Sequence, residues 1–87
     1  MKLTFTVLER PTDAAVSRAY VGRDEQGRRQ IFVLVWIEGM VEVFGGRWAA
    51  YPVNGCALDN PRFQEVAAFA LARLDNGLEL DGATVEV

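Results

Sequence analysis

Side chains able to carry catalytic chemistry are few in this sequence. It contains no histidine and a single cysteine, Cys56, in the segment Asn-Gly-Cys-Ala. Without histidine, the Ser/His/Asp and Cys/His arrangements of nucleophilic catalysis are excluded, and zinc or copper sites are disfavoured. No base or cation neighbours Cys56 in the sequence, so we interpret it as a structural or incidental thiol. We therefore expect a non-enzymatic protein with no catalytic, metal-binding or cofactor-binding residues.

The acidic residues mostly occupy positions where acids support structure. Asp24 and Glu25 fall in a predicted turn, and Asp59 and Glu65 fall around a predicted helix start. Glu42 is the one acid inside an apolar strand, so it is the residue to inspect for a raised pKa. An enzyme or ligand-binding site over Glu42 that uses carboxylates and aromatic residues is the alternative hypothesis. An exposed strand position explains Glu42 more simply.

Arginine and aromatic residues together raise a third hypothesis, weak binding of single-stranded nucleic acid. Aromatic rings can stack on bases while arginines contact phosphates. The formal net charge of −3 and the missing glycine–aromatic signature of RNA-recognition strands argue against it. We interpret the arginines as solvated strand ends. The residues concerned are Arg18, Arg23, Arg28, Arg29, Arg47, Tyr20, Phe32 and Trp48.

The elements that position these residues centre on two apolar runs, residues 31–37 and 40–44, separated by Glu38-Gly39. This pattern predicts an antiparallel hairpin. The first run is apolar at every position, so both faces of its strand need cover. In the hairpin register, Phe32, Leu34 and Trp36 share the face that we expect to be the core.

The opposite face of this hairpin supplies the candidate interface. Its side chains are apolar with one acid among them, and one helix cannot cover both faces of the sheet. We add Phe69 of a predicted helix, residues 61–75, because helical periodicity places it about 120° from the centre of the stripe that packs on the sheet. The candidate interface residues are Val33, Val35, Ile37, Met40, Glu42, Phe44 and Phe69.

The remaining strands are predicted from alternation and turn signals. Leu3, Phe5 and Val7 alternate with polar residues, as in a half-buried strand. Residues 16–24 and 28–37 form a hairpin, with Gly27 in the turn. Gly45-Gly46 predicts a further hairpin turn that places Trp48 and Ala50 on the core face, and Pro52 ends that strand. Residues 78–87 form either a short hairpin or one strand at the sheet edge.

One helix has clear start and stop signals. Asn60 is the predicted cap, Pro61 the first helical residue, and Gly77 the C-terminal stop after Asp75. We therefore predict an α+β fold, an antiparallel β-meander of four to six strands with a single α-helix, about residues 61–75, packed on one face. The length of 87 residues predicts one domain spanning 1–87.

These observations favour a small protein–protein interaction domain as the function. Its partner would be another protein or a second copy, and it would act as a homodimer or as an inhibitor or adaptor that binds sterically. Small acidic domains of this kind occur among phage and mobile-element inhibitors, including anti-defence and immunity proteins. No membrane partner, small-molecule ligand or cofactor is implied. We expect a cytoplasmic protein, because a single cysteine and an N-terminus without an apolar run do not indicate secretion.

Overall fold

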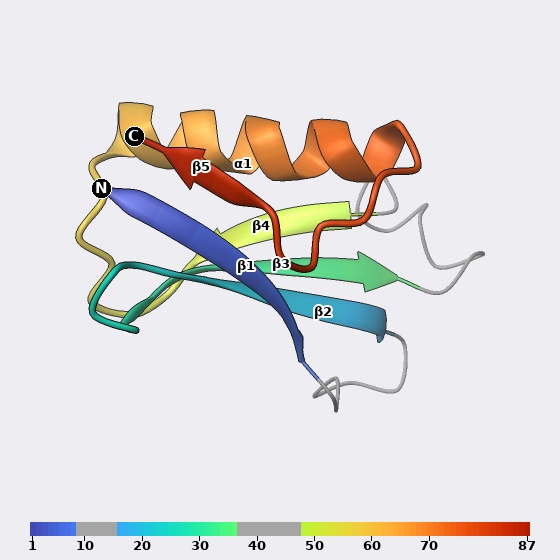
Figure 1. The fold of residues 1–87 in the computed structure, drawn as a ribbon, viewed down its shortest axis with the longest axis horizontal. Helices are drawn as coiled ribbons and strands as arrows, with labels where there is room; N and C mark the ends of the chain where they lie inside the picture. The colour runs from blue at the N-terminus through green and yellow to red at the C-terminus, as the bar shows by residue number, and fades with distance from the viewer. Residues whose placement is uncertain (9–15, 37–47) are drawn as a thin grey trace.

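The computed structural model describes residues 1–8, 16–36 and 48–87. In chain order the described elements are β1 (Lys2–Leu8), β2 (Val16–Arg23), β3 (Arg29–Trp36), β4 (Trp48–Pro52), α1 (Asn60–Asp75) and β5 (Thr84–Glu86). The strands form one antiparallel sheet in the order β4-β3-β2-β1-β5. Figure 1 shows α1 lying along one face of this twisted sheet. The predicted α+β fold with a single helix on an antiparallel sheet is confirmed.

The first three strands form where the alternation and turn signals placed them. Leu3 and Phe5 of β1 are fully buried and Thr4 between them is half-buried, whereas Val7, predicted on the same buried face, is 41% exposed. The β2–β3 hairpin closes through Gly27, whose φ of 80° is the left-handed conformation that favours glycine. At the other end of the chain, β5 pairs with β1 as a single edge strand. This is one of the two arrangements predicted for the C-terminal residues.

A buried polar network fixes the β2–β3 turn to the chain before α1. The carboxylate of Asp24 accepts hydrogen bonds from the backbone N–H groups of Gln26 (3.0 Å) and Arg28 (2.9 Å) and from Nε2 of Gln30 (3.0 Å). Oε1 of Gln30 accepts a further bond from the backbone N–H of Ala57 at 2.8 Å. Burial would raise the pKa of Asp24, but these hydrogen bonds together with the charge of Arg28 lower it.

The helix begins one residue earlier than predicted. Asp59, not Asn60, is the cap, and its side chain accepts a hydrogen bond from the backbone N–H of Arg62 at 3.0 Å. Pro61 lies in the first turn, where a missing N–H costs nothing. The helix ends at Asp75, Asn76 is its C-terminal cap, and Gly77 follows with a φ of 70°.

Strand β3 is paired differently from the prediction. Its neighbours are β2 and β4, with Phe32 opposite Tyr51, Val33 opposite Ala50 and Leu34 opposite Ala49. The partners predicted for Val33, Leu34 and Val35 among residues 42–44 are therefore wrong, because β2 and β4 occupy both sides of β3 at these positions. Residues 40–44 themselves lie outside the described residues.

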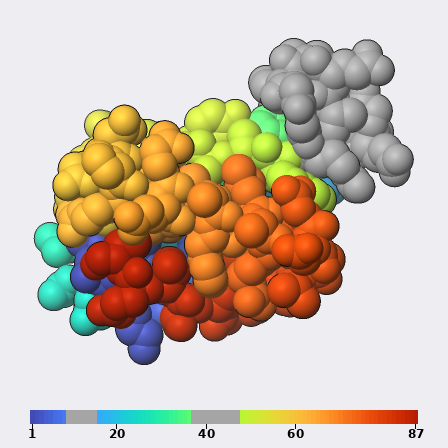
Figure 2. Space-filling view, turned by 90° about the horizontal axis from the view of Figure 1, so that it is seen from above, coloured from blue at the N-terminus to red at the C-terminus, as the bar shows by residue number. Residues whose placement is uncertain are grey.

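The main core lies between the sheet and α1. Figure 2 views the molecule from the helix side, where α1 and the C-terminal segment lie next to each other. Partly buried residues pack around the core, including Trp48 and Ala50 from β4, as predicted. The buried residues of the main core are Leu3, Phe5, Tyr20, Ile31, Val33, Val35, Leu58, Val66, Ala67, Ala70 and Leu80.

The assignment of the two sheet faces was inverted. Val33 is fully buried and Val35 is 9% exposed, both in the core under the helix, whereas Phe32 and Leu34 lie on the opposite face. A strand that is apolar at every position does not mark which face is covered. Our assignment depended on a register with residues 40–44 that β3 does not adopt. In that predicted register Glu42 shares the face of Val33 and Val35, and this single acid is the reason why that face was not assigned to the core.

Candidate functional site

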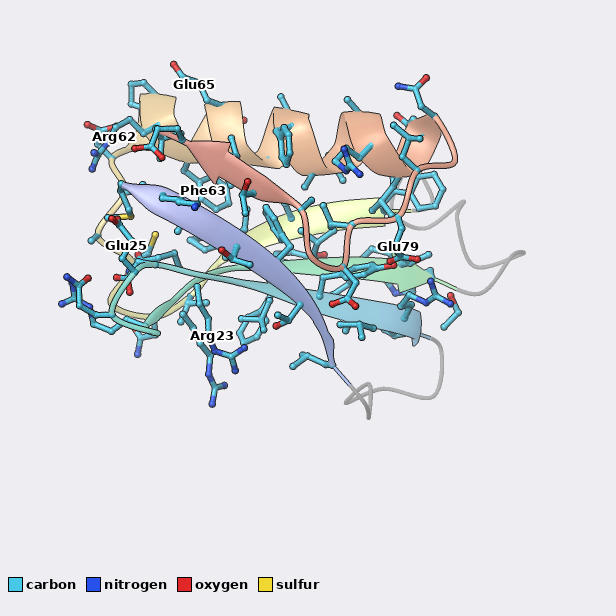
Figure 3. The ribbon with its side chains drawn as sticks, viewed as in Figure 1. Arg23, Glu25, Arg62, Phe63, Glu65 and Glu79 are labelled. Carbon is cyan, nitrogen blue, oxygen red and sulfur yellow. The ribbon has the colours of Figure 1, made fainter. Side chains whose placement is uncertain are left out.

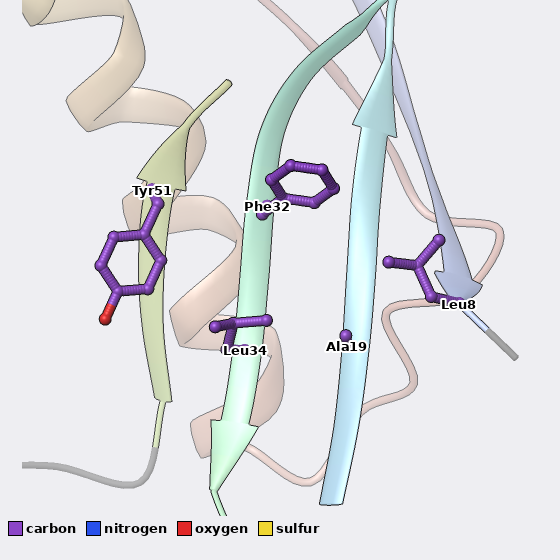
Figure 4. A pocket seen from close by; sticks show the side chains of 5 residues that line it. All are labelled: Leu8, Ala19, Phe32, Leu34 and Tyr51. Atoms are coloured by element: carbon purple, nitrogen blue, oxygen red, sulfur yellow. The ribbon is translucent and has the colours of Figure 1, made fainter. Parts of the chain in front are cut away.

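An apolar pocket lies on the side of the sheet that faces away from α1, which we call the outer face. Cross-strand pairing places its residues together, since partners in a ladder share a face. The pocket has a volume of about 250 Å³ (Figure 4). Its lining is almost wholly apolar and consists of Leu8, Ala19, Phe32, Leu34 and Tyr51.

A second, smaller apolar cluster borders this pocket. Val16, Ala19 and Trp36 are its buried members, and Leu8 and Leu34 pack against it. The Trp36 ring meets that of Tyr51 edge to face, with centroids 6.5 Å apart. Tyr51 nevertheless stays 40% exposed. The outer face therefore has a packed apolar base and at least one aromatic ring that solvent reaches.

Two arginines lie at one end of the outer face. Arg23 of β2 and Arg29 of β3 are directly opposite each other in the ladder. Figure 3 shows Arg23 pointing away from the helix, and its guanidinium donates a hydrogen bond to Oγ1 of Thr6 at 3.0 Å. The ion pairs found among the described residues involve other arginines: Arg18, Arg28 and Arg62.

A second polar cluster joins β2 to the segment before β5. The Tyr20 hydroxyl donates to Oε1 of Glu79 at 3.0 Å, and Nη1 of Arg18 donates to both the Tyr20 hydroxyl (3.2 Å) and Oε2 of Glu79 (3.3 Å). Burial raises the pKa of Tyr20. The backbone N–H of Asp81 and the Tyr20 hydroxyl lower the pKa of Glu79. These groups satisfy one another, so we interpret the cluster as a clamp on the C-terminal segment.

The predicted interface residues that the structure describes, Val33, Val35 and Phe69, do not lie on the outer face. Val33 and Val35 are core residues under the helix, so a partner cannot reach them in the folded chain. The other four strand residues, Ile37, Met40, Glu42 and Phe44, lie outside the described residues.

Phe69 also differs from its predicted position. Its ring stacks on that of the buried Phe5, with centroids 6.3 Å apart and planes at 27°, and the Arg73 guanidinium lies 5.9 Å from its centroid. The prediction that Phe69 lies on the outer side of the helix is therefore wrong. A strongly twisted sheet reaches around the flank of a helix, so the apolar stripe that packs is wider than a flat sheet would require.

The residues considered for nucleic acid binding are divided between the two faces. Tyr20 and Trp48 pack in or against the main core, while Arg23, Arg29 and Phe32 lie on the outer face. Arg18 and Arg28 are paired with carboxylates, and Arg47 lies outside the described residues. Cys56 is half-buried and packs against the main core.

Sequence reasoning missed Leu8, Ala19 and Tyr51 as members of one pocket. Leu8 and Ala19 are opposite each other across β1 and β2, and Tyr51 joins them through the β3–β4 register, which no short-range turn signal specifies. One signal was available: Ala49 and Ala50 place a small residue on each face of β4. Such a strand fits beside β3, which carries large residues on both faces.

Comparison with protein-family models, curated proteins and solved structures finds no match to this chain. Within residues 1–8, 16–36 and 48–87, no helix has both the length and the apolar character required to cross a bilayer. The same residues contain no group of three or more histidine, cysteine or acidic side chains placed to hold a metal ion.

Proposed function

We propose that this protein is a non-enzymatic protein–protein interaction domain whose contact surface is the outer face. The observation that carries the proposal is the apolar pocket formed by Leu8, Ala19, Phe32, Leu34 and Tyr51 on the side of the sheet away from α1. The proposal includes a cytoplasmic location. It also includes action by steric binding, as a homodimer or as an inhibitor or adaptor.

The size of the pocket favours a protein partner over a small-molecule ligand. Sites for drug-sized ligands usually have volumes of about 300–1,000 Å³ with a few convergent polar groups. This pocket has about 250 Å³ and an apolar lining, which suits one large side chain from a partner. Burying one such side chain contributes roughly 1.5–3 kcal/mol. In many interfaces a few buried anchors of this kind supply most of the binding energy.

The exposed large hydrophobic residues allow a matched test. Tyr51 is 40% exposed and lines the pocket, whereas Leu78 is 51% exposed and follows α1, outside the pocket lining. Tyr51→Asp and Leu78→Asp each place a charge at an accessible apolar position. We expect both variants to fold, because neither side chain belongs to the buried core.

The measurement has two arms. Sedimentation velocity of the purified wild type and both variants tests association with a second copy. Affinity capture with each protein as bait, from cells that naturally make it, tests association with a different protein. We expect Tyr51→Asp to lose the dimer or the captured protein, and Leu78→Asp to retain it. A wild type that stays monomeric and captures the same proteins as Tyr51→Asp would contradict the proposed function.

A further inference from the structure

The two arginines of the outer face stand beside the pocket. Arg23 and Arg29 form one cross-strand pair, and Val21 with Phe32 is the next pair on this face, beyond a register shift between Gly22 and Arg23. Along β2, Arg23 and Val21 are two residues apart, which is about 7 Å and within reach of a long side chain. Phe32 lines the pocket, so positive charge and an apolar anchor site are adjacent.

Two like charges directly opposite in a ladder are destabilising. In the described part of the chain, no carboxylate lies within 4 Å of either guanidinium, and Arg23 bonds only to the neutral Thr6. The acid of β5, Glu86, lies opposite Lys2 instead. An anionic group from outside would relieve this repulsion and make charge-assisted hydrogen bonds with both arginines.

The distribution of charge and apolar surface favours an acidic protein segment over nucleic acid. A strand of nucleic acid carries a phosphate on every nucleotide and needs basic residues along its whole path. On the outer face the arginines stand at one end, and the other end carries the apolar Leu8, Leu34 and Trp36. The arginines beside this apolar pocket complement a partner segment in which an acidic residue lies next to an apolar anchor side chain.

We propose, as an extension of the function proposed above, that the outer face recognises a protein segment with an aliphatic or aromatic anchor flanked by acidic residues. The anchor occupies the pocket between Phe32, Leu34 and Tyr51. The carboxylates bind the guanidinium groups of Arg23 and Arg29. The basic end of the face sets the direction in which the segment lies across the strands.

The experiment selects phage-displayed random linear peptides on the immobilised full chain. Enriched sequences are then synthesised, labelled and titrated by fluorescence anisotropy. The titrations use wild type, Tyr51→Asp, Arg23→Gln, Arg29→Gln and the control Arg62→Gln. Arg62 is a half-buried arginine at the start of α1, so its substitution removes a charge without altering the outer face.

We expect the enriched peptides to share an apolar anchor next to aspartate or glutamate. Tyr51→Asp should weaken their binding by at least about tenfold, because it places a charge in the pocket. Arg23→Gln and Arg29→Gln should each weaken it by roughly two- to fivefold, with a loss of salt dependence. Arg62→Gln should bind like the wild type.

Three outcomes would overturn the proposal, and they separate it from the function on which it rests. Enriched peptides without acids that still require Tyr51 would refute the acidic partner and leave the protein-binding function standing. Failure to enrich any peptide whose binding Tyr51→Asp abolishes would overturn recognition of an acidic segment, and the proposed function would then depend on the sedimentation and affinity-capture results alone. Binding of a labelled oligothymidine, lost in Arg23→Gln and in Phe32→Ala, would identify nucleic acid as the occupant instead.

Discussion

Replacing Gly22 by alanine tests how closely neighbouring strands pack on the sheet face that α1 covers. Gly22 lies in β2 on the face covered by α1, between Phe5 of β1 and Ile31 of β3. A Cβ atom at this position would lie 2.6 Å from Cγ2 of Ile31 and 3.2 Å from Cε1 of Phe5. Both neighbours are fully buried, and the β-branched Ile31 has little freedom at χ1.

The expected destabilisation is about 1–2 kcal/mol. Overpacking a buried site costs roughly 1–3 kcal/mol. Alanine recovers about 0.5–1 kcal/mol because it loses less conformational entropy on folding than glycine. In a domain of this size the difference lowers the melting temperature by roughly 4–16 °C. Glycine within a strand is less favourable than alanine, so the residue types alone predict the opposite sign.

The measurement is the free energy of unfolding of Gly22→Ala in urea, compared with that of the wild type. An unchanged m-value would show that the two proteins expose the same surface on unfolding. A double-mutant cycle with Ile31→Ala adds a second criterion, since removing Cγ2 creates the room that the new methyl group needs. The two substitutions together should cost less than the sum of their separate effects, with a coupling of about 0.5–2 kcal/mol. Wild-type or higher stability of Gly22→Ala would refute the close packing of these three residues.

Two further predictions concern the polar clusters. Tyr20→Phe removes the hydroxyl that bonds to Glu79, so we expect a loss of about 1 kcal/mol in urea unfolding, and an unchanged unfolding free energy would show that the clamp is not formed. In the folded chain the pKa of Asp24 lies below its ordinary value of about 4. The ionised carboxylate therefore contributes its full stabilisation of the fold above about pH 4, and this stabilisation is lost as the pH falls through the lowered pKa. Asp24→Asn should therefore destabilise the domain at neutral pH and flatten the acid limb of its stability profile, and a limb as steep as that of the wild type would argue against the network around Gln30.

Local signals in the sequence predicted the elements and the fold class. Alternation marked β1, Gly27 marked the β2–β3 turn, and Pro61 with Gly77 bounded the helix to within one or two residues. These features depend on residues within a few positions of one another. The prediction placed the cap at Asn60 and the structure has it at Asp59. Both residue types are good caps, so the residue types alone do not decide between the two positions.

The candidate site could not be predicted in the same way, because it depends on non-local pairing. Val33 and Leu34 are both apolar, and nothing in their types indicates which one faces α1. The choice depends on the pairing of β3 with β4. Eleven residues separate the end of β3 at Trp36 from the start of β4 at Trp48. Once that pairing is known, Tyr51 and Phe32 are brought together and the pocket follows.

The accessibility of the two faces of β3 tests the central claim most directly. With the native thiol removed by Cys56→Ser, Val33→Cys and Leu34→Cys place one thiol on each face of the same strand. Their rates of reaction with a thiol reagent under native conditions report which face solvent reaches. The account predicts that Leu34→Cys reacts at least about tenfold faster and is protected by a bound peptide. A faster reaction of Val33→Cys, or equally slow reaction of both, would contradict the assignment of the outer face as the binding surface.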